Sequence, residues 1–352
     1  KRSHHVAFVP DNMVSNPPYD QRLQGIGIEV VHHPYYRSVD DFLKQYGREF
    51  DLVIVARAEI AWRHLMTVKR HCPNAKIVFD TVDLHFLREE REAAVKQDAR
   101  LLASMRKRKQ QELRLARSAD LTLVVSPVEK EILERECPGL DVRIISNIIP
   151  PVEGLIPGYE ARRTIVFIGS FEHPPNVDAV LHFARDVFPI VRGELPDAVF
   201  QVIGSSMPPE IQKLSLPGVE LMGFVADVRP LFDQARLSVA PLRYGAGVKG
   251  KVNQSLSLGV PAVVTSIAAE GMHLVHEENA MIADDAEAFA RAVIRVWNDP
   301  ALWERLSING RENLREHFSV ASAEKRIDDL LQWAGLTAVA SHRERTRVHS
   351  NA

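Results

Sequence analysis

Two absences limit the class of protein that this sequence can encode. Its two cysteines, Cys72 and Cys137, each precede a proline and have no CxxC partner, so neither a zinc site nor a disulfide framework is indicated. No apolar run approaches the ~20 residues that span a bilayer, and the first residues lack the apolar core of a signal peptide. We therefore expect a cytoplasmic protein with no transmembrane segment, and peripheral attachment to the inner face of the membrane stays open.

The chain also has little net charge and no initiator methionine. A formal charge of -2 gives no global attraction to nucleic acid or to anionic lipid, so no nucleic-acid partner is expected. Because the first residue is a lysine, the chain can be a piece of a longer polypeptide, with a first strand or a fused neighbouring domain missing from it.

What the chain does have is the composition of a globular protein, with 45% hydrophobic and 26% charged residues. Its 352 residues exceed what one core usually holds, since cores stop growing beyond roughly 250 residues. Short β-branched runs alternate with longer helical patterns, which is typical of parallel sheets covered by helices. The predicted fold class is α/β, with two Rossmann-like, doubly wound domains.

A stretch rich in proline and glycine between Asn147 and Arg163 is predicted to link the two domains. The strands are predicted at 27–31, 52–55, 76–79, 121–125 and 142–145 before it, and at 164–168, 198–203, 219–222, 237–240, 262–265 and 281–283 after it. The domains are placed at 1–150, possibly truncated at its start, and at 160–318. A helix at 319–335 and a disordered tail at 336–352 follow.

One long, charge-laced helix is predicted from about Leu84 to Ser118. It contains the basic run Arg106–Lys109, which a membrane or an acidic acceptor could bind. A solvated helix face is the favoured interpretation of this run.

Ligands of open α/β sheets bind outside the carboxyl ends of the strands, so the loops after strands are candidate sites. In the loop GSFEHPP, Gly169 and Ser170 would let a ligand approach the backbone. Asn176 is predicted to cap a helix that begins at Val177. An ordinary turn with a rigid Pro-Pro stop explains this loop equally well.

The most informative loop is RYGAGVKGK, which follows the strand at 237–240. Lys249 and Lys251 lie among its glycines at a predicted helix start, where the positive end of the macrodipole disfavours cations unless an anion binds. The pattern therefore favours a phosphate site over a flexible loop with solvated lysines. It differs from a P-loop, because Val252 stands where the magnesium-binding Ser or Thr must be.

A third loop, Ser266–Met272, follows the strand at 262–265. Backbone amides around Gly271 could close on a diphosphate, and Glu270 would then meet a sugar hydroxyl. The alternative interpretation of Glu270 is a carboxylate at a helix start, where the macrodipole favours it.

Polar side chains also follow the strands of the first half. Asp80, Asp83 and His85 come just past the strand at 76–79, where they would point into a cleft between the halves. Arg57 and Ser126 occupy equivalent positions after two other strands. A structural histidine is the alternative for His85.

Four segments of the second half, GSFEHPPNVDAV, GFVADVRPLF, PLRYGAGVKGKVNQSLSLGVPAVVT and AAEGM, resemble the donor domain of retaining GT-B glycosyltransferases of family 4. The stretch DTVDLHFLREERE resembles part of their N-terminal domains. The likeness is strong over about residues 160–330 and weaker over 1–150. It implies two domains that face each other across a cleft, with the donor on the second, the acceptor entering through the first and the final helix crossing back toward the first.

The loops after the strands and the resemblance together give three groups of candidate site residues. The catalytic group is His85, Asp83 and Lys251. The donor-binding group is Gly169, Ser170, Val225, Arg243, Gly247, Lys249, Gln254, Glu270, Gly271 and Met272. The acceptor-side group is Arg57, Asp80 and Ser126. His85 would hydrogen-bond the transferred sugar, the lysines would neutralise the diphosphate, and the backbone near Val225 would touch the base.

The implied activity is hexosyltransferase-type: a sugar moves with retention from a UDP- or GDP-linked donor to a hydroxyl of a glycan, a lipid-linked molecule or a protein, in glycan, polysaccharide or glycoconjugate synthesis. The nucleotide sugar is a co-substrate, and no cofactor is expected. The sequence contains no Asp-x-Asp triplet, which could bind a divalent metal at the diphosphate. Metal-independent turnover is therefore expected.

The sequence departs from the family pattern at two glutamate positions, and it also lacks the Arg and Lys that usually follow the first glycine loop, which leaves the phosphate contacts to Arg243, Lys249 and Lys251. Gln254 stands where members of the family commonly have a glutamate that hydrogen-bonds the ribose hydroxyls. Ala246 stands where a second glutamate is often found. An amide can still bond a ribose hydroxyl, but it lacks the charge-assisted component. A GT-B nucleotide-sugar epimerase and a catalytically degenerate nucleotide-sugar-binding module of a larger protein therefore remain alternatives.

Overall fold

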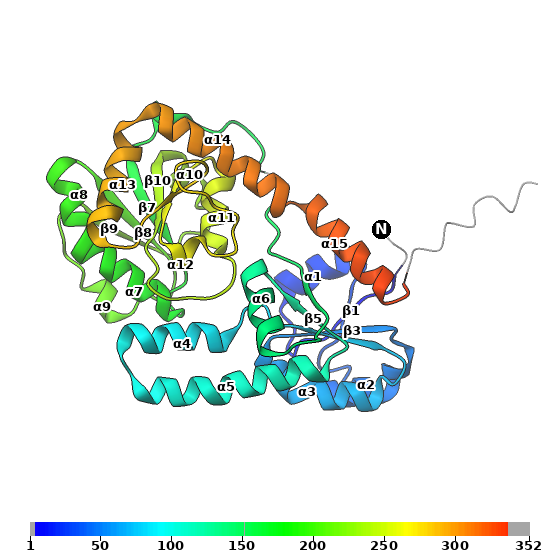
Figure 1. Ribbon diagram of the computed structural model, residues 1–352. Helices are drawn as coiled ribbons and strands as arrows, with labels where there is room; N and C mark the ends of the chain where they lie inside the picture. The colour runs from blue at the N-terminus through cyan, green and yellow to red at the C-terminus, as the bar shows by residue number, and fades with distance from the viewer. Residues whose placement is uncertain (1–3, 151, 337–352) are drawn as a thin grey trace, which may run out of the picture. The chain divides into compact units, whose positions relative to one another are not determined.

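The computed structural model describes residues 4–150 and 152–336, and the chain divides into two compact units. The first unit contains the chain up to Thr81, the segment Arg114–Leu123 and the chain from Lys325 onward. The second contains Val82–Leu113 and Val124–Glu324. Figure 1 labels the helices and many of the strands named below.

The N-terminal part of the chain alternates short strands and helices, as predicted. Its elements are β1 (Ala7–Phe8), α1 (Pro17–Gly25), β2 (Glu29–Val30), α2 (Val39–Tyr46), a 3-10 turn (Gly47–Glu49), β3 (Leu52–Ala56), α3 (Ala58–His71), β4 (Lys76–Asp80), α4 (His85–Lys96), α5 (Ala99–Ser118), β5 (Leu121–Val124), α6 (Pro127–Glu136) and β6 (Val142–Ile144). The four later strands form one sheet in the order β3-β4-β5-β6. The short β1 pairs in parallel with β2. Sequence analysis did not find β1, because two residues are too few to show a strand pattern.

The predicted single helix from Leu84 to Ser118 is two helices. Gln97 adopts the left-handed conformation, with φ of 52°, and its N–H donates to the carbonyl of Ala93, which ends α4. The Asp98 Oδ1 then accepts a 2.8 Å hydrogen bond from the Arg100 N–H at the start of α5. This is the short polar capping that lets a new helix begin, and the prediction of one helix is therefore wrong.

The second unit contains a six-stranded parallel sheet in the order β9-β8-β7-β10-β11-β12. Its elements are a 3-10 turn (Tyr159–Ala161), β7 (Thr164–Ile168), α7 (Pro174–His182), a π-helical turn (Phe183–Val187), α8 (Phe188–Glu194), β8 (Val199–Ile203), α9 (Pro209–Gln212), β9 (Val219–Gly223), α10 (Arg229–Gln234), β10 (Ala235–Ala240), α11 (Gly250–Ser257), β11 (Ala262–Val264), α12 (Ser266–Ala269), β12 (Met281–Ile282), α13 (Ala286–Asn298), α14 (Pro300–His317) and α15 (Val320–Trp333). Counted within the sheet, this is the Rossmann order 3-2-1-4-5-6. The last residues of α15, from Lys325, belong to the first unit.

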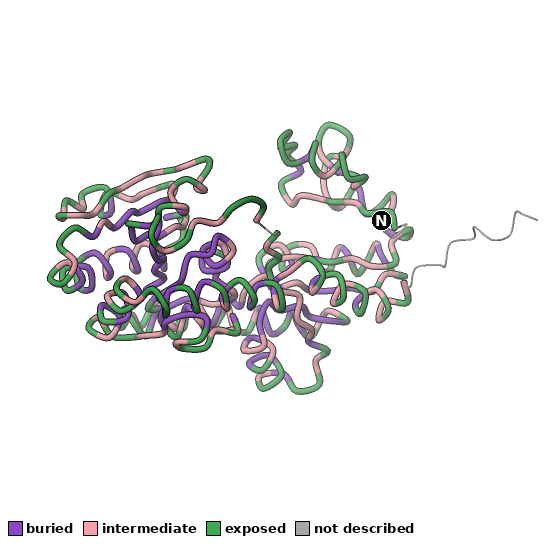
Figure 2. Tube along the Cα trace, turned by 90° about the horizontal axis from the view of Figure 1, so that it is seen from above, coloured by how far each residue is buried: buried purple, intermediate pink, exposed green. Residues whose placement is uncertain are grey.

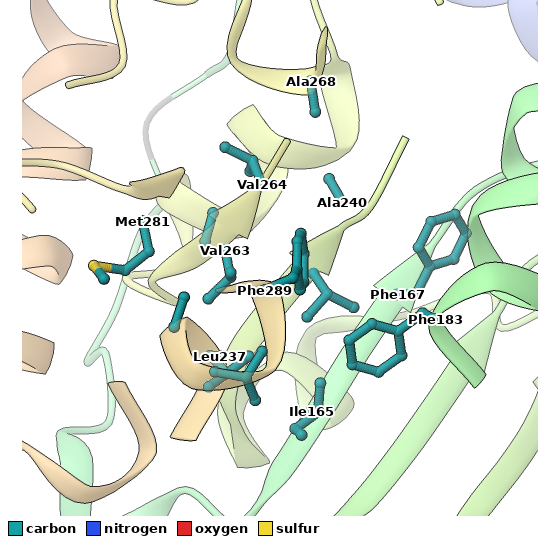
Figure 3. Close-up of a cluster of buried hydrophobic side chains, with 14 of the residues drawn as sticks. Ile165, Phe167, Phe183, Leu237, Ala240, Val263, Val264, Ala268, Met281 and Phe289 are labelled. Carbon is teal, nitrogen blue, oxygen red and sulfur yellow. The ribbon is translucent and has the colours of Figure 1, made fainter. Parts of the chain in front are cut away.

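The core of the second unit lies between its sheet and the covering helices. Every residue of β10 is buried, as expected for a central strand of a parallel sheet. Ile165, Phe167 and Leu237 meet Phe183 and Phe289 from the helix side, as Figure 3 shows. Figure 2 marks such buried stretches in purple through the interior of this unit. This rigid layer fixes the carboxyl ends of the strands, where the candidate site lies.

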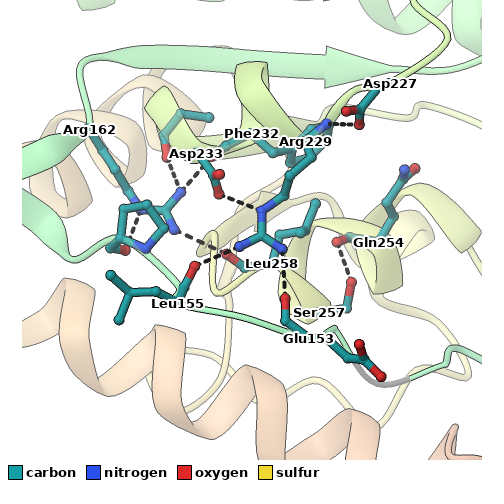
Figure 4. Close-up of polar contacts among 12 residues, drawn as sticks. Glu153, Leu155, Arg162, Asp227, Arg229, Phe232, Asp233, Gln254, Ser257 and Leu258 are labelled. Atoms are coloured by element: carbon teal, nitrogen blue, oxygen red, sulfur yellow. Dashed lines mark hydrogen bonds and ion pairs between the residues drawn. The ribbon is translucent and has the colours of Figure 1, made fainter.

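A buried arginine ties the linker to the second unit. Arg162 is fully buried, and its guanidinium donates to four backbone carbonyls (Figure 4): Pro157 at 2.9 Å, Phe232 at 2.6 Å, Ala235 at 3.0 Å and Leu258 at 3.0 Å. Burial lowers the Arg162 pKa to about 10. The arginine thus joins the linker to the ends of α10 and α11.

The described part of the chain has no helix that is both long enough and apolar enough to cross a membrane. The predicted tail lies, from residue 337 on, outside the described residues.

Candidate functional site at the carboxyl edge of the six-stranded sheet

The strand order places a topological switch point between β7 and β10. These two strands pair in parallel, while the chain continues to β8 and β9 on one side and to β11 and β12 on the other. Ligands of doubly wound sheets bind in the crevice at such a point, outside the carboxyl ends of the strands. The loop that begins at Gly169 follows β7, and the glycine loop Gly245–Gly250 follows β10, so two of the three predicted loops flank this point.

Lys251 bridges these two loops from the first turn of α11. Its Nζ donates a hydrogen bond to the Asn176 Oδ1 and lies 4.2 Å from the centroid of the Phe167 ring. A Cβ atom on Gly169 would lie 3.1 Å from the same Nζ. Burial, together with the charge of Lys249, lowers the Lys251 pKa to about 7. An ammonium group at a helix N-terminus, beside a glycine backbone, is suited to an anion.

Asn176 does not have the predicted capping role. Helix α7 begins at Pro174 and has His173 as its N-cap, which agrees with the preference of proline for the first helical turn. Asn176 is buried within that turn, and its Nδ2 donates to the Ser170 carbonyl at 2.6 Å. The amide therefore connects the loop after β7 to Lys251, and the predicted helix start at Val177 is wrong.

Lys249 is turned toward the glycine loop. It is the N-cap residue of α11, and it is 7% exposed. Its Nζ donates to the Gly247 carbonyl at 2.6 Å and to the Ala246 carbonyl at 3.3 Å. Burial lowers the pKa of Lys249 to about 8. The two predicted lysines thus supply two closely spaced cations, of which Lys251 faces the loop after β7.

Asp83 and His85 form a hydrogen-bonded pair at the start of α4. The His85 Nε2 lies 3.0 Å from the Asp83 Oδ1, and Arg88 donates to the other oxygen at 2.6 Å. Burial raises the Asp83 pKa, but the bond to His85 and the charges of His85 and Arg88 outweigh it, so the pKa lies below its usual value. A Cβ on Gly247, whose φ is 67°, would lie 3.1 Å from the Asp83 Cβ. The pair therefore adjoins the glycine loop.

Glu129 is a buried carboxylate that sequence analysis missed. Its oxygens accept from the Leu84 N–H at 3.0 Å and from the Val125 N–H at 3.3 Å, and burial raises its pKa to about 7. The Glu129 N–H in turn donates to the Oγ of Ser126, the N-cap of α6. The spacing Ser126-Pro-Val-Glu129 is that of a capping box, which could have identified Glu129 as a residue that fixes the start of α6, but not its contact with Leu84.

The third loop contacts α4 and α6 through Glu270 and Gly271. Arg91 forms a bidentate ion pair with Glu270, at 3.0 and 2.6 Å, and also donates to the Gly245 carbonyl at 2.7 Å. Gly271 has φ of 73°, and a Cβ there would lie 2.4 Å from the Ser126 Cβ. Glu270 follows the last residue of α12, so the interpretation as a helix-start carboxylate is wrong. Arg91 was also missed, because a charged residue in a charge-laced helix gives no distinguishing pattern.

The remaining residues of the predicted donor-binding group differ in their contacts and burial. Arg243 pairs with Asp178 of α7, and Met272 is fully buried in the core. Gln254 is half-buried on α11, where its backbone carbonyl accepts from the Ser257 hydroxyl at 2.7 Å (Figure 4). Val225 packs at the edge of a small cluster beside β7 and β8.

The two remaining acceptor-side residues lie in the first unit. Arg57, which has φ of 71°, donates its N–H to the Asp80 carbonyl at 2.8 Å. They therefore lie next to each other at the ends of β3 and β4.

Across residues 4–150 and 152–336, no group of three or more His, Cys, Asp or Glu residues is placed to hold a metal ion.

Comparison with known proteins shows which sequences and structures this chain resembles. Residues 162–299 match the sequence family Glycosyl transferases group 1. The chain is 21% identical over 356 residues to a putative glycosyltransferase, YtcC of Bacillus subtilis, with 91% of this chain and 82% of the relative covered.

Solved structures show the same fold. Sucrose-phosphate synthase from Thermosynechococcus elongatus superposes with a TM-score of 0.70 at 17% identity, covering 94% of this chain and 88% of that one. HepE of Anabaena, solved in complex with UDP and glucose, superposes with a TM-score of 0.67 at 13% identity, covering 93% and 91%. The fold is therefore that of the GT-B glycosyltransferases, which confirms the predicted α/β class with parallel sheets.

Proposed function

We propose that this chain is a glycosyltransferase that moves a sugar from a nucleoside diphosphate donor to an acceptor hydroxyl. The observation that carries the proposal is the position of Lys251, whose ammonium group lies at the N-terminus of α11, at the switch point of the sheet and beside Gly169. A diphosphate bound there would meet a desolvated cation and the positive end of a helix.

The relatives support a nucleotide-sugar donor. The matched family covers the segment that contains Gly169, Lys251 and Glu270, and HepE was solved with UDP and glucose and also with UDP-glucose. By this likeness we assign a UDP-linked sugar as the first donor to test, and a glycan, lipid-linked molecule or protein as the acceptor. Arg57, Asp80 and Ser126 are proposed on the acceptor side.

The chemistry follows from the charges that must be stabilised. When the glycosidic bond to the diphosphate breaks, negative charge develops on the leaving phosphate, and Lys251 and Lys249 with the helix N-terminus stabilise it. We assign to His85 a hydrogen bond to the transferred sugar, with Asp83 fixing the orientation of its ring through the 3.0 Å contact. The leaving diphosphate would take the acceptor's proton on the same face of the sugar, which gives retention without a divalent metal.

A calorimetric titration tests the donor site. UDP, GDP and ADP are added in EDTA to the wild-type chain, to Lys251→Ala and to Lys213→Ala, which removes an exposed lysine after α9. Loss of the Lys251 contact should cost about 1.5 to 3 kcal/mol, or roughly ten- to a hundredfold in Kd. Lys213→Ala should bind as the wild type does. Absence of binding by the wild-type chain to all three would contradict the proposal.

A second candidate function is a nucleotide-sugar-binding module without transferase activity. The observation in its favour is Gln254 on α11 together with Ala246 in the glycine loop, which leaves both positions of the common glutamates uncharged. Tight binding of a nucleoside diphosphate with no sugar transfer to any hydroxyl acceptor, and no release of free nucleotide, would favour the module.

A further inference from the structure

One side chain of helix α4, that of Arg91, contacts both the glycine loop and the third loop. The Arg91 Nη1 donates both to the Glu270 Oε1 and to the Gly245 carbonyl, and the Nη2 donates to the Glu270 Oε2. Both side chains of the ion pair are only 20% exposed. All three residues belong to the second unit, so this contact lies within one compact body.

The same helix covers the glycine loop at further points. The Lys96 Nζ lies 5.8 Å from the centroid of the Tyr244 ring, and Ala246 packs against the cluster that contains Leu84 and Phe86. The glycine loop is thus held on one side by α4 and on the other by its own strand, β10. Among these contacts, that of Arg91 alone involves both loops.

Arginine is the side chain that suits this position. Its planar guanidinium carries five donors in a fixed fork, which matches a carboxylate in two parallel hydrogen bonds, and it has a donor to spare for the Gly245 carbonyl. Lysine could neutralise Glu270 but could not form the fork. A carboxylate has about four lone-pair positions, so Glu270 can still accept a bond from a ligand hydroxyl while Arg91 holds it.

The ion pair also affects the charge at the proposed diphosphate site. Glu270 and Arg91 lie close enough to Lys249 to act on its charge in opposite directions, the carboxylate favouring the ammonium form and the guanidinium opposing it. Without Arg91, the uncompensated carboxylate of Glu270 would attract Lys249 and repel a diphosphate.

We propose that Arg91 is a positioning residue of the donor site, which aligns the glycine loop with Glu270 and neutralises that carboxylate so that a nucleoside diphosphate can bind. The inference rests on the proposed function and adds a residue outside the recognised segments of the second half. It assigns part of the donor-binding energy to α4, a helix that follows a strand of the N-terminal sheet.

The test compares Arg91→Ala with Arg91→Lys and with Arg108→Ala. Arg108 lies on α5, and its ion pair with Glu89 is 3.0 Å long, with side chains 28% and 18% exposed, so it is a matched control for loss of a partly buried arginine pair. UDP binding is measured by calorimetry, and donor KM and kcat are measured with the acceptor that the wild-type enzyme uses. Arg91→Ala should raise the UDP Kd and the donor KM about tenfold and change kcat less, as expected for lost binding interactions.

Two further measurements test whether the loss of UDP affinity comes from the ion pair between Arg91 and Glu270. Arg91→Lys should recover part of the loss, because it restores the charge but not the fork. Glu270→Gln should cost less in the Arg91→Ala background than in the wild type, because residues that act as a pair are not additive.

Three results would overturn the inference: unchanged UDP binding in Arg91→Ala, an equal loss in Arg108→Ala, or strict additivity of Arg91→Ala with Glu270→Gln. If the wild-type chain binds no nucleoside diphosphate, the proposed function itself is wrong and the inference with it. If the wild type binds UDP and loses it through Lys251→Ala while Arg91→Ala binds normally, only the role of Arg91 is wrong.

Discussion

Gly271 approaches Ser126 so closely that no side chain fits between them. A Cβ on Gly271 would lie 2.4 Å from the Ser126 Cβ and 2.9 Å from its Oγ, and the backbone of Gly271 is left-handed, with φ of 73°. The third loop therefore lies directly against the N-cap of α6.

This contact predicts that Gly271→Ala destabilises the second unit by about 1 to 3 kcal/mol, because both the clash and the left-handed backbone must be accommodated. Thermal unfolding followed by circular dichroism measures the change. Gly193→Ala is the control, since Gly193 lies in α8 with open space around it and alanine should raise stability there by up to about 1 kcal/mol. If Gly271→Ala is as stable as Gly193→Ala, the third loop does not lie directly against Ser126.

The affinity for a diphosphate should depend on pH through Lys251. Its pKa is lowered to about 7, and a bound anion favours the charged form and raises that pKa. At a pH between the Lys251 pKa of the free protein and the higher Lys251 pKa of the complex, the protein must take up a proton when the anion binds. The affinity therefore falls as pH rises, by at most about tenfold per pH unit for one group.

Titrations of UDP between pH 7 and 9 measure this slope. Lys251→Arg should show a shallower dependence, because a guanidinium stays charged over the whole range and, of the two site lysines, only Lys249, whose pKa is about 8, still titrates there. Equal slopes in the wild type and in Lys251→Arg would mean that Lys251 is not the group that changes charge.

Arg162→Met should destabilise the second unit by about 3 kcal/mol or more, since the methionine leaves four backbone carbonyls, three of them buried, without the donors of the guanidinium. Arg229→Met is the comparison, because Arg229 also binds the linker, through the Leu155 carbonyl at 2.7 Å, but that hydrogen bond is exposed. It should cost about 1 kcal/mol or less. The midpoint of thermal unfolding ranks the two variants, and a larger loss for Arg229→Met would contradict the assignment of Arg162 as the main anchor of the linker.

The sequence pattern was sufficient to find the strands of the four- and six-stranded sheets, because a buried parallel strand is a nearly continuous apolar, β-branched run such as Thr164–Ile168 of β7. The loops at the switch point could also be predicted, since glycines and lysines at a helix start are unusual. Contacts between segments distant in sequence could not be predicted: Arg91 meets Glu270 only because α4 lies over the glycine loop, and nothing in the residues near Arg91 indicates that partner. The break at Gln97 was missed because a left-handed residue other than glycine leaves little trace in the sequence.

The role of Gln254 is open to a direct test. A glutamine lacks the charge-assisted component of a bond to a ribose hydroxyl, so if this side chain faces the ribose, Gln254→Glu should tighten binding of UDP. Pyrophosphate, which has no ribose, should not gain from the change and should lose slightly through repulsion between the new carboxylate and its phosphates. A charge-assisted bond exceeds a neutral one by about 1 kcal/mol, so the ratio of the two Kd values should shift roughly fivefold. Calorimetry with both ligands separates the two effects within one variant, and an equal change for UDP and pyrophosphate would show that residue 254 senses only the phosphate charge and not the sugar attached to it.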